Sequence, residues 1–131
     1  MTIEEKHKKV VKLTERLVKK SQTGVPIIVE GPNDVKSLRR LGFEGEIFCL
    51  KNCQIGFYDF IDKFRKEKEL IIMTDFDKEG RELSKNLMRE LSSMKINTNI
   101  SIREQMEGLM KSDIKAIEEL AGYLNKVKST A

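Results

Sequence analysis

The sequence predicts an α/β fold with a four-stranded parallel sheet in the order 2-1-3-4, sandwiched by helices. Short apolar runs of strand length alternate with longer segments in which apolar residues recur at helical spacing. Two of these runs, 27–29 and 70–73, lead into acidic residues and a glycine, at Glu30-Gly31 and within Thr74–Gly80. Right-handed crossovers favour placing these two strands side by side, with both acidic ends at one crevice.

The first part of the chain predicts a helix, a strand and a second helix. Apolar residues at helical spacing indicate an N-terminal helix over 3–20, whose remaining surface is rich in lysine. The run 27–29 follows as the first strand. Pro32 is typical of a helix start, and Gly42 of a helix end.

The middle of the chain repeats this alternation. We expect a second strand over 46–50 and a third over 70–73. Aromatic and aliphatic residues at helical spacing predict a helix over 56–68 between them. A leucine stripe predicts another helix over 79–92, directly after the second acidic ending.

The C-terminal part is less regular. Residues 95–100 alternate apolar and polar side chains, which is typical of an edge strand, and 101–111 read as a loop or a short helix. Ser112 is expected to cap a last helix over 112–127. The terminal helices, 3–20 and 112–127, could cover a sheet face or form a dimer surface, and we favour packing on the same domain.

Composition limits the class of protein. With 131 residues and 39% hydrophobic content, we expect one domain over 1–131, with its core at about 25–100. No apolar stretch is long enough to span a bilayer and the start is charged, so we expect a cytoplasmic protein. Cys49 and Cys53 lack the further ligands of a zinc site, and we interpret them as reduced thiols.

The acidic strand ends predict a metal site. Glu30 follows the first strand, while Asp75 and Asp77 follow the third. If they converge at the carboxyl edge of the sheet, their like charges need a cation. Mg²⁺ is the natural ion, because it is a hard cation that takes oxygen ligands and needs only one or two carboxylates beside waters and phosphates.

At these residues the chain resembles the Toprim family, the catalytic domain shared by topoisomerases, bacterial primases and some nucleases. The likeness covers roughly 25–100. A glutamate that ends a strand is matched by Ile27-Ile28-Val29-Glu30-Gly31, and an Asp-x-Asp that ends a later strand by Asp75-Phe76-Asp77. The residues around Glu30 are similar to primases and ribonucleases, whereas Asp75 to Gly80 is similar to type IA topoisomerases, so the subfamily stays open.

The resemblance implies roles for individual residues. Glu30 and Asp75 would hold a first Mg²⁺, and Asp75 and Asp77 a second, with Mn²⁺ as a substitute. Glu30 could also act as general acid or base. Glu79 matches a third acid of the topoisomerase-like pattern and could be an additional ligand. We interpret Asp34 as a supporting group or a helix N-terminal charge before we interpret it as a ligand.

Basic residues follow the acidic pair along the helix at 79–92. The row consists of Lys78, Arg81, Lys85 and Arg89. Such a row could contact nucleic-acid phosphates or could simply be a solvated face, and the net charge of +4 does not decide between them. Arg103, just after the last predicted strand, could also reach the site.

We therefore expect a Mg²⁺-dependent nuclease or related phosphodiester-processing protein that acts on RNA or DNA, alone or with a protein partner. One alternative is a non-catalytic, metal-dependent nucleic-acid-binding or assembly module. Another is a phosphatase with Asp75 as covalent nucleophile, which fits less well because such enzymes place this aspartate on the first strand. The acids could also merely cap the next helix, which carboxylates stabilise by about 0.3–1 kcal/mol.

Overall fold

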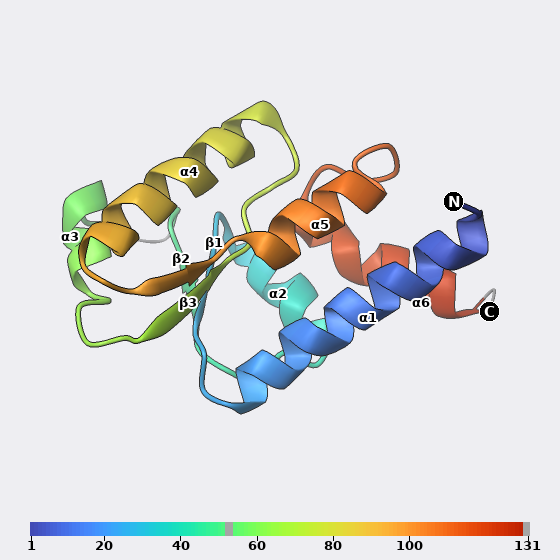
Figure 1. The fold of residues 1–131 in the computed structure, drawn as a ribbon, viewed down its shortest axis with the longest axis horizontal. Coiled ribbons are helices and arrows are strands. Elements are labelled where there is room, and N and C mark those ends of the chain that lie inside the picture. The colour runs from blue at the N-terminus through green and yellow to red at the C-terminus, as the bar shows by residue number, and fades with distance from the viewer. Residues whose placement is uncertain (52–53, 130–131) are drawn as a thin grey trace.

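A computed structural model describes residues 1–51 and 54–129. A parallel sheet lies between helices, and the terminal helices lie on one side of it (Figure 1). The elements in chain order are α1 (Ile3–Gln22), β1 (Ile27–Val29), α2 (Pro32–Arg40), β2 (Ile47–Cys49), α3 (Phe57–Asp62), β3 (Glu69–Ile72), α4 (Lys78–Ser93), β4 (Asn97–Asn99), α5 (Ser101–Met110), the short 3₁₀ helix η1 (Ile117–Glu119) and α6 (Leu120–Ser129).

The predicted sheet order is confirmed. The four strands are parallel and lie in the order β2-β1-β3-β4. Ile27 of β1 is in register with Ile47 of β2 on one side and with Ile71 of β3 on the other. Because β1 and β3 are hydrogen-bonded neighbours, the loops that follow them start at the same edge of the sheet.

The two faces of the sheet bury different clusters. Alternate strand residues point to opposite faces, so Ile27, Val29 and Ile71 belong to one cluster, and Ile28, Leu70 and Ile72 to the other. The first cluster also contains residues of α1, α2, α5, η1 and α6, whereas α3 and α4 cover the second face. Both terminal helices therefore contribute to the apolar cluster on this face, α1 beside α5 and α6 beside α2.

The expected helix over 56–68 is wrong in its length. α3 ends at Asp62, and the chain continues through turns closed by bonds from Phe64 N–H to Ile61 C=O and from Glu67 N–H to Phe64 C=O. These tighter turns still bury Phe64, whose side chain is 1% exposed. The apolar spacing thus identified the buried residues, but it did not show that the helix tightens before β3.

The C-terminal expectation also needs correction. Residues 101–110 form a helix, α5, which decides between the two alternatives left open there. Ser112 does not cap a helix over 112–127, because the chain turns after α5 and the last helix begins only with η1 and α6. The backbone between these helices bonds to the loop after β3, as described below, and so is not available for an earlier helix.

The other expected elements are present, with ends shifted by one or two residues. Within the described ranges, no helix combines the length and the apolar character needed to cross a bilayer.

Candidate functional site

The two acidic motifs meet at the carboxyl edge of the sheet. Glu30 directly follows β1, and Asp75 lies just beyond the end of the neighbouring β3. The Oε2 atom of Glu30 accepts a hydrogen bond from the backbone N–H of Asp75, at 2.7 Å. Asp77 is near enough for its charge to act on both carboxylates. The structure therefore brings Glu30, Asp75 and Asp77 into one region.

Electrostatics in this region favour the neutral or cation-bound form of the acids. Burial raises the pKa of Glu30, Asp34 and Asp75, and backbone N–H donors to each oppose the rise. The charges of neighbouring carboxylates raise each pKa further. For Glu30 these neighbours are Asp75, Asp77 and Asp34, and for both Asp34 and Asp75 they include Glu118. A bound cation would relieve this repulsion.

The loop that carries Glu30 is short and closed by local contacts. Gly31 is the N-cap of α2, and Pro32 opens the helix. The Oδ2 atom of Asp34 accepts the backbone N–H of Gly31 at 3.0 Å, and the Asp34 side chain is buried. Asp34 is thus part of the turn that supports Glu30. The charges of Asp75 and Glu118 raise the pKa of Asp34.

The loop that carries Asp75 and Asp77 folds back on the first turn of α4. Asp77 is the N-cap of α4, and its Oδ1 atom accepts the N–H of Gly80 at 2.6 Å. The Thr74 hydroxyl donates to the Gly80 carbonyl at 2.7 Å. A Cβ at Gly80 would lie 2.0 Å from the Asp75 carbonyl oxygen, so only glycine permits this approach.

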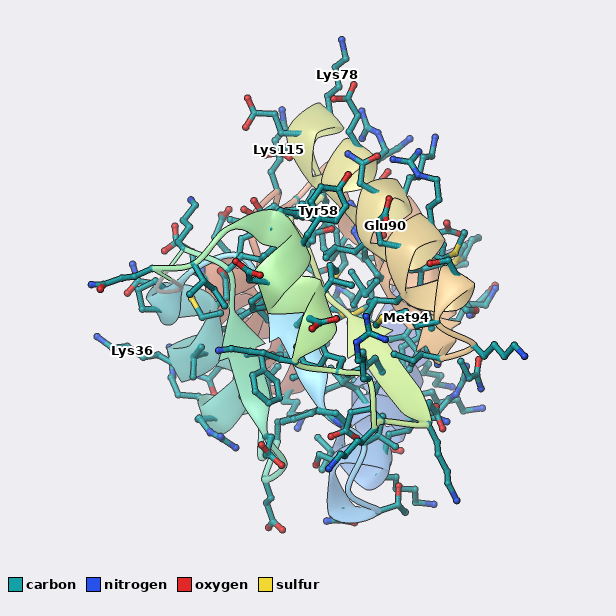
Figure 2. All side chains as sticks on the ribbon, turned by 90° about the vertical axis from the view of Figure 1, so that its left-hand side faces the viewer. Lys36, Tyr58, Lys78, Glu90, Met94 and Lys115 are labelled. Atoms are coloured by element: carbon teal, nitrogen blue, oxygen red, sulfur yellow. The ribbon has the colours of Figure 1, made fainter. Side chains whose placement is uncertain are left out.

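The turn before η1 also contacts this loop, and sequence reasoning missed it. The N–H of Phe76 donates to the Lys115 carbonyl at 2.6 Å, and the N–H of Ile117 donates to Asp75 Oδ1 at 2.8 Å. Figure 2 shows Lys115 and Lys78 extending from the same end of the molecule. The first bond joins two backbone groups and the second joins a backbone N–H to a carboxylate. Both connect distant segments, so no local pattern in the sequence could have indicated them.

Two cations flank the acidic region. Arg103, which the sequence suggested only as able to reach the site, donates to the carbonyl oxygens of Thr74 and Asp75 from a buried position. Lys51, which we did not select, lies after β2, and its charge lowers the pKa of Asp75 against the larger effect of burial. Lys51 also packs beside Gly31.

The remaining predicted site residues lie further out. Glu79 is exposed on the first turn of α4 and makes no hydrogen bond or ion pair within the described residues. Lys78 and Lys85 are exposed. Arg81 pairs with Glu107 at 3.3 Å, and Arg89 contacts Glu90 and Asn86.

The donor chemistry fits a hard divalent cation. Glu30, Asp75 and Asp77 each give one carboxylate oxygen to a backbone N–H, and that bond leaves the second oxygen uninvolved. Within residues 1–51 and 54–129, no three His, Cys, Asp or Glu side chains are grouped closely enough to hold a metal by themselves. Mg²⁺ is compatible with this arrangement because one or two carboxylates suffice when waters and substrate phosphates complete its shell.

Of the two cysteines that we interpreted as reduced thiols, one lies within the described residues. Cys49 is free and half-buried, with its Sγ donating to the Glu30 carbonyl at 3.6 Å. Cys53 lies outside the described residues.

Comparison with known proteins agrees with the geometry. The profile of a family described as "Toprim domain" matches residues 25–104. A UPF0292 protein of Methanocaldococcus jannaschii is 40% identical over 103 residues, which cover 77% of this chain and 79% of the relative. A UPF0292 protein of Thermococcus gammatolerans is 34% identical over 127 residues, which cover 97% of this chain and 92% of the relative.

A solved structure supports the fold. A "putative protein from Aquifex aeolicus" is similar with a TM-score of 0.69 and 25% sequence identity, over 83% of this chain and 95% of that one. The family match covers both acidic motifs, which the structure joins at one edge of the sheet. Toprim domains generally bind Mg²⁺, and the domain indicates a metal-dependent function related to nucleic acids. This chain belongs to the Toprim domain family.

Proposed function

We propose that this chain is a Mg²⁺-dependent nuclease that hydrolyses phosphodiester bonds in RNA or DNA. The observation that carries the proposal is the hydrogen bond of 2.7 Å from the Asp75 N–H to Glu30 Oε2. It joins the loops after β1 and β3, so that carboxylates from both motifs lie at one edge of the sheet. Acids gathered in this way are suited to metal-assisted phosphoryl transfer.

The acidic residues would bind metal together. Glu30 and Asp75 would hold a first ion, and Asp75 and Asp77 a second, with Glu79 near enough in sequence to serve through a water. When bound, Mg²⁺ or Mn²⁺ would neutralise phosphate charge and make a water more acidic. Asp34 would support the turn that carries Glu30 and would not itself hold metal, because its side chain already accepts the N–H of Gly31.

Glu30 is the candidate general acid or base. Burial and the neighbouring acids raise its pKa, which makes the carboxylate a better proton acceptor than an exposed glutamate. In hydrolysis the water oxygen bonds to phosphorus while the bond to the leaving oxygen breaks. Glu30 would accept the proton of the water, and the leaving oxygen would take up a proton from Glu30 or from solvent.

Basic residues at the same end of the molecule as the acids offer contacts for the phosphates of a nucleic-acid strand. Lys78 opens α4 and extends outward at the same end of the molecule as Lys115 (Figure 2). Lys85 is exposed two turns along the helix. Arg81 and Arg89 belong to the same row, but their guanidinium groups are paired with acidic residues. We expect Lys78 and Lys85 to make the stronger phosphate contacts, because contacts by Arg81 and Arg89 would first have to break these pairs.

We also propose that residues 1–131 act as one domain, with its core at about 25–100. α1 and α6 contribute Leu17 and Leu124 to the cluster that lies under the sheet. Both side chains are 1% exposed. Removing either terminal helix would expose this cluster to water.

A second candidate is a binding module that grips phosphate without cleaving it. The observation that favours it is the lack, among the described residues, of three acidic, histidine or cysteine side chains grouped as a ready metal site. A site that is completed only by the phosphates of its ligand could bind nucleic acid and metal together without turnover.

The deciding experiment incubates the purified protein with Mg²⁺ or Mn²⁺ and end-labelled single- and double-stranded RNA and DNA. A nuclease cleaves at least one substrate, stops when the metal is chelated, and loses cleavage but not binding in Glu30→Gln. Glu82→Gln is the matched control, because Glu82 is exposed on α4 and outside the acidic region.

The alternatives give different results. Metal-dependent binding without cleavage of any substrate supports the binding module and refutes the nuclease. An aspartyl phosphate trapped on Asp75 during hydrolysis of a small phosphomonoester supports the phosphatase instead.

A further inference from the structure

Arg103 is a buried cation directed at the backbone that carries Asp75. Its side chain is 2% exposed, although it belongs to α5 near the edge of the sheet. The Nε atom donates to the Thr74 carbonyl at 3.1 Å and to the Thr74 hydroxyl at 2.8 Å. The Nη2 atom donates to the Asp75 carbonyl. One guanidinium group thus contacts two consecutive residues at the exit of β3.

The partners of Arg103 explain how this charge is tolerated. Glu107, one turn further along α5, places Oε1 3.0 Å from Arg103 Nη2, and Glu107 Oε2 pairs with Arg81 of α4. Glu107 Oε1 is buried without a well-aligned hydrogen bond among the described residues, so the pair is held by charge. The guanidinium also lies over the Phe76 ring, 5.9 Å from its centroid.

Stability alone does not account for such an arrangement. A buried ion pair costs desolvation energy, and apolar side chains of similar volume are often at least as stabilising. What a guanidinium adds is a rigid planar fork of donors, which can fix two carbonyl groups at once. Here both carbonyl groups belong to the loop that presents Asp75.

We propose that Arg103 is a positioning residue that sets the direction of the Asp75 carboxylate by holding the carbonyl groups of Thr74 and Asp75. The N–H of Asp75 is bound to Glu30 and its Oδ1 to Ile117, so a shift of this backbone would also change both of these contacts. Arg103 touches no substrate and acts through Asp75. The inference rests on the proposed function only in that Asp75 is taken to hold metal.

The test measures Mn²⁺ affinity by electron paramagnetic resonance, without nucleic acid, in the wild type and in Arg103→Lys and Thr74→Val. Lysine keeps the charge but lacks the fork. Valine removes the hydroxyl that Arg103 contacts, together with the bond of that hydroxyl to the Gly80 carbonyl. We expect Arg103→Lys to weaken Mn²⁺ binding by about 10–100-fold, as is typical when groups that orient a metal ligand are lost, and Thr74→Val to weaken it less.

Two control variants separate positioning from general destabilisation. Arg65→Lys changes an exposed arginine on the far side of the sheet, and Ile61→Val removes one methylene from the cluster under α3 and α4. The latter should cost about 0.5–1.5 kcal/mol of stability. Both should leave Mn²⁺ affinity unchanged, because neither contacts the loop after β3.

The inference is overturned if folded Arg103→Lys binds Mn²⁺ as the wild type does, or if Ile61→Val weakens binding equally. If Arg103→Lys does not fold, Thr74→Val decides in the same way. A wild type that binds Mn²⁺ but cleaves no nucleic acid refutes the nuclease. The role of Arg103 is then still decided by the Mn²⁺ affinities of the variants. A wild type that binds no Mn²⁺ in the absence of nucleic acid contradicts this inference, whereas the nuclease is then judged by the cleavage assay, because substrate phosphates can complete the metal shell.

Discussion

The two loops that carry the acidic residues are held in different ways. The loop between β1 and α2 is only two residues long, and the bond from the Gly31 N–H to Asp34 that closes its turn spans three positions. The loop between β3 and α4 is longer and is held from afar, by Arg103 on α5 and by the turn at 115–117. The turn of the first loop closes locally, and its distant contact is the bond of Glu30 to Asp75, whereas the second loop has local bonds to Gly80 and is also held by two distant segments.

This difference shows where the site is sensitive. The backbone of Glu30 lies between the end of a buried strand and the start of a helix, and its carboxylate accepts the N–H of Asp75. Asp75 is placed by segments more than 25 residues away in sequence, so changes in α5 or before η1 should reach the site. We therefore expect the loop after β3 to govern metal binding more strongly than the loop after β1.

The largest expected effect comes from replacing a glycine in or next to each loop with alanine, at Gly31 in the first loop and at Gly80 in the first turn of α4. In Gly80→Ala the new Cβ would lie 2.0 Å from the Asp75 carbonyl oxygen, whereas in Gly31→Ala the nearest atom is Lys51 Cδ at 3.6 Å. Gly80→Ala should lose about 1–3 kcal/mol or more of unfolding free energy, because backbone must move. Gly31→Ala should stay within about 0.5 kcal/mol of the wild type. Urea unfolding in the presence of chelator measures both, and equal losses would contradict the comparison.

A smaller effect is expected when the local contact of the first loop is removed. Asp34→Ala deletes the acceptor for the Gly31 N–H and should cost about 0.5–2 kcal/mol, as for other capping side chains. Asp34→Asn keeps an oxygen acceptor and loses the repulsion from Asp75 and Glu118, so it should cost less. The same unfolding measurement applies. If Asp34→Asn is as unstable as Asp34→Ala, the charge rather than the hydrogen bond holds this turn.

The helices after the two loops should differ in their contribution to nucleic-acid binding. Lys78→Gln and Lys85→Gln on α4 should each reduce the slope of log affinity against log salt by about 0.7–0.9, if each lysine contacts one phosphate. Lys36→Gln on α2 is the control, because Lys36 projects from another part of the surface (Figure 2). Affinities are measured over a salt series in a Glu30→Gln background. A slope altered equally by Lys36→Gln would place the nucleic acid elsewhere.

The smallest effect concerns the pH dependence of the metal-free protein. The pKa of Glu30 and of Asp75 is raised in the fold, from ordinary values of 4.5 and 3.8, mainly by burial. The folded state therefore binds protons more tightly than the unfolded state does. The associated stability is complete below the ordinary values and is lost as pH rises through the raised ones.

Raising the pH from about 4 to about 7 should thus lower the unfolding free energy more in the wild type than in Glu30→Gln. Asp34, Asp77 and Glu118 act on the same acids and remain in both proteins. The groups are only half-buried, so solvent screening keeps the difference small. Unfolding in chelator across this range tests the sign, and a wild type that gains more stability than Glu30→Gln would reverse it.

The candidate acids could be selected from sequence because each motif is local. An apolar run followed by an acid indicates a strand with a carboxylate at its end, and two such runs indicate a shared edge. Arg103 was recognised only as near the site, and Glu107, Glu118 and Ile117 were not recognised at all. Glu107 pairs with Arg103, the charge of Glu118 acts on Asp75, and Ile117 bonds to Asp75, so these interactions join segments that have no fixed spacing in sequence.

What the sequence by itself determined is the alternation of elements, the order of the sheet and the identity of the residues that enter the core, because side-chain periodicity and right-handed crossovers follow from local geometry. What only the tertiary structure decided is how the loop after β3 is held. The end of α3 and the late start of the last helix belong with it. Before the last helix, backbone groups bond to the loop after β3 instead of within a helix, and after α3 they bond in tighter local turns that keep Phe64 buried.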